Sequence, residues 1–334
     1  MENRKVTIAD VAKRAKVSPA SVSRYLNGVE GNLSPDTADR IRQAIDEMGY
    51  QPNAWARSLK TRRSGLLAVV AADLSNSYVP SVLDGIDSAA NDAGYSLIIG
   101  NAKNDQSREA MLLERLHQQR IEGLVLQSTA EHSSGPLRSL MESGIPIMLI
   151  DRSVDGQSDL DLVALDNRGA ISMALGHLRA QGFSQIIYVT DPPDMASSRR
   201  ERELAVMASR SSWAAVRVVV RRDATPAALV EAIGDLLTDS ERTAVLCSNA
   251  VATLYALDAI QAGGWAVPGE LGLMMVDNPD WAPYVLGGIT SVAQPTHDLG
   301  RQAAMRLLHR IRHPAIPPME MRLPGQLIVR KSTQ

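Results

Sequence analysis

Short apolar runs recur along the central part of the chain and alternate with stretches in which apolar residues return every three or four positions. The runs fall into two series of four, namely LLAVVA, SLIIG, GLVLQ and PIMLID, then IIYVT, VRVVV, AVLCS and GLMMV. Such runs predict buried parallel strands, and the stretches near 79–93, 105–119 and 136–143 predict helices between them. The two series therefore predict two similar α/β lobes with mainly parallel sheets.

The first fifty residues have a different pattern, with three short helical periods that each begin at a capping residue. Thr7 predicts a cap for a helix from Ile8 to about Ala15, with Asp10 in its first turn. Ser18 and Pro19 begin a helix that Asn27-Gly28 should end. A third helix should begin at Ser34-Pro35 and stop before Gly49. Three such helices, the first two joined by a tight turn, predict a helix-turn-helix unit.

Charge separates the same two regions. Residues 1–63 contain 12 Lys and Arg against 7 Asp and Glu, whereas the rest of the chain contains 23 against 30, for a formal net charge of −2. A basic head on an acidic body is typical of a polyanion-binding module attached to another domain. The second helix of a helix-turn-helix unit lies in the major groove of DNA, so exposed Ala20, Ser21 and Arg24 should face bases.

Length and composition add limits. A chain of 334 residues predicts two or three domains, and its one cysteine, Cys247, excludes an internal disulfide framework. No apolar run approaches membrane-spanning length and no signal-peptide core is present, so we expect a cytoplasmic protein. P-loop, G-x-G-x-x-G and G-x-S-x-G motifs are absent, and the His309/His313 pair lacks a third ligand in its sequence context. We therefore expect neither an enzyme nor a metal or cofactor site.

The segments VTIADVAKRAKVSPASVSRYLNG and GYQPNAWARSLKT resemble the LacI/GalR family of bacterial transcription regulators. The resemblance continues through GLLAVVAADLSNSYVPSVLDGID, RIEGLVLQS, IPIMLIDR, LDNRGAISMALGHL and GITSVAQPTHDLGRQAAMRLL. It implies an α/β fold: a helix-turn-helix head on a two-lobed core like that of periplasmic binding proteins. The implied division is 1–52 for the head, 53–63 for a hinge helix and linker, and 64–334 for the core. Lobe 1 would span about 64–161 and 292–320, and lobe 2 about 162–291 and 321–334.

The resemblance also implies which residues contact DNA. Positions 19, 20 and 24 would read bases, and Arg24 is the best candidate because Pro19 and Ala20 offer few hydrogen bonds. The hinge helix would begin at Asn53 and pair with a second copy in the minor groove, where Leu59 would wedge open a base step. An isolated helix this short is marginal in water, so it should order only when docked. The full set of DNA-contacting candidates is Thr7, Ser18, Pro19, Ala20, Ser21, Ser23, Arg24, Asn27, Asn53, Arg57 and Leu59.

Ligands of parallel α/β lobes bind beyond the carboxyl ends of the strands. Polar residues directly after the predicted strands are therefore candidates for a small-molecule site between the lobes, and the family's effector residues coincide with several of them. Packing or surface ion pairs are the alternative role for each residue alone. The predicted effector-binding set is Tyr78, Gln127, Asp151, Arg152, Arg199, Arg202, Asn249, Asp277 and Trp281.

Amides and carboxylates suit sugar hydroxyls, and Arg152, Arg199 and Arg202 favour an anionic sugar. The stretch VDNPDWAPYVLGGITSVAQPTHDLG resembles the subgroup that responds to keto-sugar acids such as 2-ketogluconate or 2-keto-3-deoxygluconate. We therefore expect a homodimeric repressor of a carbohydrate-catabolism operon, released from a palindromic operator by such an effector, with a tetramer also open. The alternatives are a regulator that responds to a neutral sugar and a two-lobed sugar-binding protein without DNA regulation.

Overall fold

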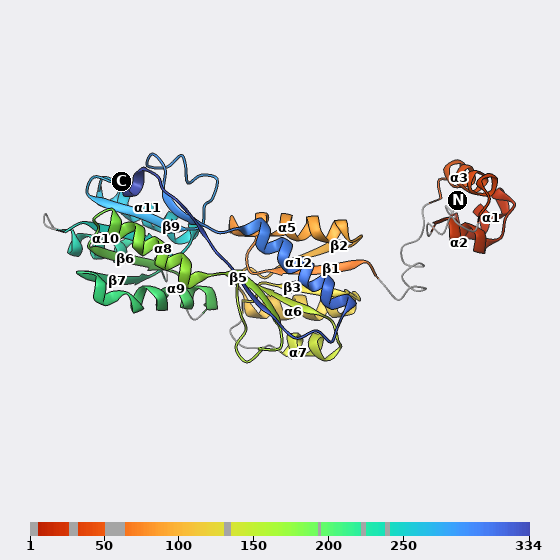
Figure 1. Cartoon of the computed structure of the whole chain (residues 1–334), viewed down its shortest axis with the longest axis horizontal. Helices are drawn as coiled ribbons and strands as arrows, with labels where there is room; N and C mark the ends of the chain where they lie inside the picture. The colour runs from red at the N-terminus through yellow and green to blue at the C-terminus, as the bar shows by residue number, and fades with distance from the viewer. Residues whose placement is uncertain are drawn as a thin grey trace. The chain divides into compact units, whose positions relative to one another are not determined.

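The computed structural model describes residues 6–26, 33–50, 64–129, 135–192, 195–221, 225–237 and 241–334. The chain forms two compact units, Met1–Ser64 and Gly65–Gln334 (Figure 1). This division separates the predicted head from the predicted core, and each unit is described by itself below.

The first unit contains the three predicted helices, α1 (Ile8–Ala15), α2 (Pro19–Leu26) and α3 (Pro35–Met48). At the start of α1, the Thr7 hydroxyl accepts from the Asp10 backbone N–H, and the Asp10 carboxylate accepts from the Thr7 N–H at 2.9 Å. Ser34 caps α3, and Gly49 ends it with a φ of 58°, a left-handed conformation that glycine adopts at little cost. The predicted caps of α1 and α3 are thus confirmed.

A small apolar core holds these helices together. Val11, Val22 and Ile41 are fully buried, one from each helix, and Tyr25 and Leu26 pack against them. The apolar stripe of α2 is therefore used for packing, and its remaining side chains are left to other contacts.

The second unit contains two six-stranded sheets, which confirm the predicted pair of α/β lobes. The first sheet has the order β11-β5-β4-β3-β1-β2 with all pairings parallel. Helices α5 and α12 cover one face, and α6 and α7 cover the other. The bounds are β1 (Leu66–Ala71), α5 (Tyr78–Asp92), β2 (Ser96–Asn101), α6 (Gln106–Gln118), β3 (Gly123–Leu126), α7 (Gly135–Glu142), β4 (Ile147–Ile150), β5 (Asp161–Leu165), α12 (Thr296–Arg312) and β11 (Glu320–Leu323).

The second sheet has the order β12-β10-β9-β8-β6-β7, parallel except for the β10–β12 pair. Helices α10 and α11 pack on one face, and α8 and α9 on the other. The bounds are α8 (Asn167–Ala180), β6 (Gln185–Thr190), α9 (Ser197–Ala208), η3 (Arg210–Ser212), β7 (Ala215–Val220), α10 (Ala227–Leu236), β8 (Thr243–Cys247), α11 (Ala250–Gly263), β9 (Leu271–Val276), β10 (Thr290–Ala293), β12 (Gln326–Ile328) and η4 (Lys331–Thr333).

The chain passes between the lobes three times, but at positions slightly later than the expected boundaries. Strand β5 belongs to the first sheet, where it lies between β4 and β11, so the first crossing follows Leu165 rather than residue 161. Strand β10 belongs to the second sheet, and β11 returns to the first. Strand pairing sets these boundaries, because β5, from Asp161 to Leu165, makes its ladder hydrogen bonds within the first sheet.

Helices α5 and α12 cross so closely that glycine is required on both. A Cβ on Gly85 would lie 2.0 Å from the His297 carbonyl oxygen, and one on Gly300 would lie 2.0 Å from the Val82 carbonyl oxygen. The C-terminal helix is thereby fixed to the first lobe, although the strands on either side of it along the chain belong to different lobes.

Candidate functional site

Polar side chains follow the strands of both lobes, as the sequence predicts, and most of them are buried. In the first lobe, Gln127 follows β3 and Asp151 follows β4. Gln127 Nε2 donates to Asp151 Oδ2 at 3.0 Å, and Gln127 Oε1 accepts from the Ala72 backbone N–H at 3.2 Å. The amide is thereby fixed in one orientation, with its donor toward the carboxylate.

Arg152 extends this group. Its Nε lies 3.5 Å from Asp151 Oδ2, and its Nη1 donates to the Ser128 carbonyl at 3.2 Å. The side chain is nearly fully buried, yet Nε makes no hydrogen bond within the part of the chain that the structure describes. A buried guanidinium with an unused donor is costly unless a further acceptor reaches it.

In the second lobe, Asp191, which the sequence analysis did not single out, is the centre of a cluster. Asp191 directly follows β6, and its Oδ2 accepts from Asn249 Nδ2 at 3.0 Å. Arg221 Nε donates to Oδ1 at 2.7 Å, and Arg199 Nη2 lies 3.4 Å from Oδ2. One carboxylate thus holds two guanidinium groups. Ligand-binding residues are expected directly after parallel strands, and this expectation applied to β6 and β7 would have found both Asp191 and Arg221, since Arg221 is the residue after β7.

A cavity of about 130 Å³ lies between these two clusters. Its wall includes Gln127 and Arg152 from the first lobe, and Asp191, Arg199 and Arg221 from the second. Of the predicted effector residues, Gln127, Arg152 and Arg199 therefore line the cavity directly. The remaining lining residues are Ala72, Asp73, Ser75, Asn76, Val79, Asn104 and Val251.

The other predicted effector residues do not line the cavity. Asn249 caps α11 with its Oδ1, which accepts from Ala252 N at 2.8 Å, and Asp277 accepts from the Ala250 N–H at 3.0 Å. Arg202 is 3 % exposed and donates to Asn167 Oδ1 at 2.7 Å and to the Ser248 carbonyl at 2.6 Å. Trp281 is only partly buried and packs against the apolar core of the second lobe.

The pKa of Tyr78 in the first lobe and the pKa of Asp277 in the second each depend on charged groups of the other lobe. Burial, reinforced by the charges of Asp151 and Asp277, raises the pKa of Tyr78 well above its usual 10, so the phenol stays neutral. Burial also raises the pKa of Asp277, although Arg202 acts in the opposite direction. The buried Tyr78 hydroxyl has no hydrogen-bond partner among the described residues. Asp151 and Asp277 both have a positive φ, of 65° and 84°, a strained conformation that often marks functional sites.

In the first unit, α2 presents the predicted DNA-reading residues. Ala20 and Arg24 are exposed, while Val22 between them is fully buried, so one face of α2 packs and another is available. The Ser18 hydroxyl accepts from the Ser21 N–H at 3.1 Å, which is the expected N-terminal cap. Ser23 is partly buried and Pro19 and Thr7 are exposed. The predicted Asn27, Asn53, Arg57 and Leu59 lie outside the described residues, as does the segment 53–63.

Two further features bear on the expected functions. Within the described ranges, no helix is long and apolar enough to cross a membrane. The same residues contain no group of three or more His, Cys, Asp or Glu arranged to hold a metal ion, and His309 and His313 pack ring edge to ring face with centroids 4.8 Å apart.

A helix-turn-helix unit and a two-lobed α/β core with a polar cavity between its lobes define the class of ligand-responsive transcription regulators. Residues 7–53 match the model for bacterial regulatory proteins of the lacI family, and residues 175–333 match a periplasmic binding protein-like domain. The chain is 39% identical to the HTH-type transcriptional regulator PtxS of Pseudomonas aeruginosa, covering 98% of this chain and 96% of that protein. The chain belongs to the LacI family.

Other relatives agree. The HTH-type transcriptional regulator KdgR of Bacillus subtilis is 32% identical, with 98% of this chain and 97% of KdgR covered. Among solved structures, a lac repressor dimer bound to operator and the anti-inducer ONPF has a TM-score of 0.83 at 22% identity, covering 99% of both chains. A LacI-family regulator from Silicibacter pomeroyi has a TM-score of 0.75 at 23% identity, with 98% of this chain and 99% of that one covered. Both relatives are transcriptional regulators, and these solved structures share the fold.

Proposed function

We propose that this regulator is a cytoplasmic, homodimeric repressor that leaves its operator when a sugar acid of the keto-sugar-acid class binds between its lobes. The observation that carries the proposal is the set of three guanidinium groups, Arg152, Arg199 and Arg221, on the wall of one cavity. Arginine binds carboxylates with paired, charge-assisted hydrogen bonds. Gln127 and Asn76 on the same wall supply amides suited to sugar hydroxyls.

The arrangement of these arginines supports a ligand that acts on lobe orientation. Arg152 belongs to the first lobe, whereas Arg199 and Arg221 belong to the second. A carboxylate that engages both sides favours one distance between the lobes, and a ligand shifts an equilibrium by its differential affinity for the two states. We propose that this shift reaches DNA through the segment 53–63, whose predicted hinge helix is stable only when paired and docked.

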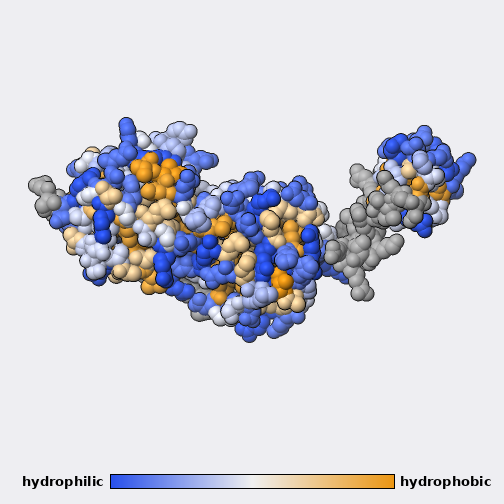
Figure 2. All heavy atoms as spheres, viewed as in Figure 1, coloured by the Kyte–Doolittle hydropathy of each residue, from blue (hydrophilic) through white to orange (hydrophobic). Residues whose placement is uncertain are grey.

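A dimer is supported by exposed apolar side chains on both lobes of the core. Ile99 on the edge strand β2 is 49% exposed, and Tyr284 in the second lobe is 86% exposed. Met111, Leu254 and Leu286 are also exposed, and the view in Figure 2 shows apolar patches within a mostly hydrophilic exterior. Burying such residues between two copies would place two recognition helices on the halves of a palindrome.

Thermal unfolding in the presence of candidate ligands tests the effector class. A ligand at 100 times its dissociation constant stabilises the folded state by about 2.7 kcal/mol, so a binder raises the melting temperature measurably. We expect 2-ketogluconate or 2-keto-3-deoxygluconate to do so, and glucose and ribose at the same concentration to have no effect. Stabilisation by a neutral sugar alone would favour the neutral-sugar alternative and contradict the role given to the three arginines.

DNA binding is tested separately by electrophoretic mobility shift with promoter fragments from the source genome. The proposal predicts a slower band at one or a few palindromic sites, lost when the active sugar acid is added. A chain that binds the sugar acid but shows no preference for any promoter fragment over random DNA would contradict the repressor assignment and favour a sugar-binding protein without DNA regulation.

A further inference from the structure

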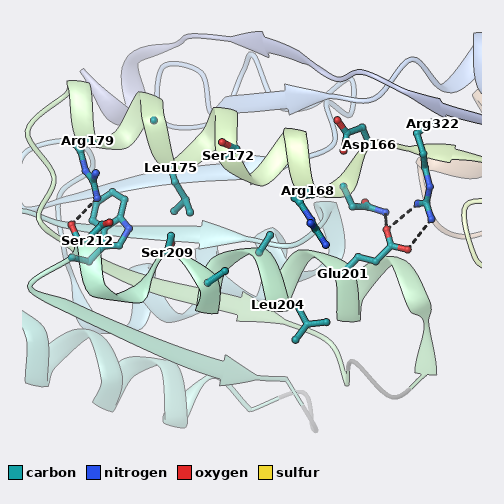
Figure 3. A pocket seen from close by; sticks show the side chains of 15 residues that line it. Asp166, Arg168, Ser172, Leu175, Arg179, Glu201, Leu204, Ser209, Ser212 and Arg322 are labelled. Carbon is teal, nitrogen blue, oxygen red and sulfur yellow. Dashed lines mark hydrogen bonds and ion pairs between the residues drawn. The ribbon is translucent and has the colours of Figure 1, made fainter.

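A continuous chain of charged and amide groups connects the second lobe's buried Arg202 to a strand of the first lobe. Arg202 Nε donates to Asn167 Oδ1 at 2.7 Å, and Asn167 Nδ2 donates to Glu201 Oε2 at 2.7 Å. Glu201 in turn accepts two bonds from Arg322, from Nη1 and Nη2, both at 2.9 Å. The paired Arg322–Glu201 contact is seen at one end of the groove between α8 and α9 (Figure 3).

The two ends of this chain belong to different lobes. Arg322 lies on β11, which pairs with β5 in the first sheet. Glu201 lies on α9, and Asn167 is the first residue of α8, and both helices pack on the second sheet. The Arg322–Glu201 pair is therefore a direct ion pair between the lobes. It lies close to two of the three segments of chain that connect the lobes.

The chemistry of the groups fixes the order of the chain. A guanidinium has only donors and a carboxylate only acceptors, so the Asn167 amide must turn Oδ1 to Arg202 and Nδ2 to Glu201. Asn167 is 1% exposed, so water is a poor substitute for either partner. If Glu201 is not held by Arg322, the amide loses the contact that sets its orientation, and Arg202 loses a fixed acceptor.

We propose that Asn167, Glu201 and Arg322 are positioning residues that couple the orientation of the lobes to the placement of Arg202, which lies one turn of α9 from the cavity-lining Arg199. Arg322 has two further acceptors that keep it on the first lobe, the Glu320 carboxylate at 2.6 Å from Nε and the Leu165 carbonyl at 3.3 Å from Nη1. Rotation of one lobe against the other therefore acts on the Arg322–Glu201 bonds, because Arg322 is also bonded to two acceptors of the first lobe.

The connection between lobes is tested without ligand or DNA. Spin labels at Arg138→Cys on α7 and Asp258→Cys on α11, both exposed, report the distance between lobes when labelled protein is diluted with unlabelled chain. Cys247 is fully buried and will label poorly. We expect Arg322→Gln and Glu201→Gln each to at least double the width of the distance distribution. Arg217→Gln, which breaks the exposed Arg217–Asp235 pair inside the second lobe, should leave it unchanged.

The link to Arg202 rests on the proposed effector and is tested by calorimetric titration of 2-ketogluconate. Arg322→Gln should weaken binding at least threefold in the wild-type background, but less than 1.5-fold in an Arg202→Lys background, since one ammonium nitrogen does not reproduce the separate Nε and Nη1 donors that Arg202 directs to Asn167 and Ser248. Arg217→Gln should leave the affinity for 2-ketogluconate unchanged in both backgrounds.

Unchanged distance widths in both Gln variants would overturn the inference, as would equal losses of affinity in the two backgrounds. Failure of the wild type to bind any sugar acid would instead contradict the proposed effector, and the distance measurement would still decide whether the lobes are coupled through Arg322.

Discussion

Arg221 donates a hydrogen bond from Nε to the Oδ1 atom of Asp191 at 2.7 Å, and both side chains line the cavity between the lobes. The pair makes Arg221 available to a ligand's carboxylate without leaving its charge unneutralised when the cavity holds no ligand. Since Arg221 is about one-third exposed and Asp191 is buried, the arginine is the partner that can turn toward a ligand.

The first prediction follows from this pair. Arg221→Ala should weaken binding of 2-ketogluconate about tenfold or more, because a hydrogen bond to a charged group contributes about 1.5–3 kcal/mol. Calorimetric titration measures the change. Arg217→Ala, on the strand that Arg221 directly follows but paired with Asp235 on the exterior, is the matched control and should bind like the wild type. Equal affinities for the two variants would exclude Arg221 from ligand recognition.

The second prediction concerns Arg202. Arg202→Ala should bind operator normally but remain bound when the sugar acid is added, because Arg202 holds Asn167 and Ser248 one turn of α9 from the cavity-lining Arg199 and lies in the core rather than the DNA-binding head. Mobility-shift titrations with and without effector give the result, and circular dichroism checks that the buried Asn167 and Ser248 acceptors left unpaired do not unfold the lobe. Release at the wild-type effector concentration would show that Arg202 has no role in induction.

The third prediction concerns α2. Arg24→Ala should reduce discrimination between operator and random DNA by about 1–3 kcal/mol, the usual contribution of a bidentate arginine–base contact. Arg42→Ala on α3, an exposed arginine paired with Asp39, serves as the control. Fluorescence anisotropy with operator and scrambled duplexes measures the affinity of each variant for specific and for random DNA. A uniform loss of affinity for both duplexes would make Arg24 a phosphate contact.

The fourth prediction concerns the stability of the core. Asp161 is 1% exposed and receives Arg306 Nε at 3.0 Å and the Met319 N–H at 2.8 Å, in addition to Arg310. Burial opposes its ionisation, but the bonds from Arg310, Arg306 and Met319 outweigh burial and lower the pKa of Asp161 below its usual 3.8. The carboxylate therefore contributes stability that is present above about pH 4 and lost as pH falls through the lowered pKa.

Asp161→Asn should accordingly cost about 3–5 kcal/mol at pH 7, the usual loss when one partner of a buried ion pair is removed. Its free energy of unfolding should also fall less than that of the wild type between pH 5 and pH 3. Denaturant unfolding of the full chain at several pH values measures both, with the exposed Asp235→Asn as control. Parallel pH profiles for wild type and Asp161→Asn would contradict this account of Asp161.

The sequence was sufficient for the parts of the fold that depend on local pattern. The run LLAVVA coincides with β1, because five of its six residues are buried and none is polar. The caps at Thr7 and Ser34 were equally clear, since side-chain capping depends on residues three positions apart. By contrast, β10 is the short stretch TSVA, and its polar residues Thr290 and Ser291 are typical of a loop although both are buried. Their hydroxyls bond to the C-terminal segment, a contact that no local pattern indicates.

The site was predicted in part for the same reason. Residues directly after strands, such as Gln127 and Asp151, could be found because parallel strands end at one edge of a sheet. The sequence alone could not distinguish the role of Arg202 from that of Arg199, because both residues lie on α9. Only the structure shows that Arg199 lines the cavity while Arg202 bonds to Asn167 and Ser248. Asp191 directly follows β6 and could have been found in the same way, but its bonds to Asn249 and Arg221, 58 and 30 residues away along the chain, could not.

The central claim, that ligand in the cavity controls DNA binding, is tested most directly by adding 2-ketogluconate to a preformed complex of the protein with its fluorescent operator. Because coupling between two sites is reciprocal, the sugar acid should lower operator affinity by the factor by which operator lowers sugar-acid affinity, typically about 5–150-fold. We predict a saturable fall in anisotropy to the value of free DNA for the wild type, and no fall for Arg202→Ala. An anisotropy that stays constant or rises with saturating sugar acid, in a protein that calorimetry shows to bind it, would contradict the account.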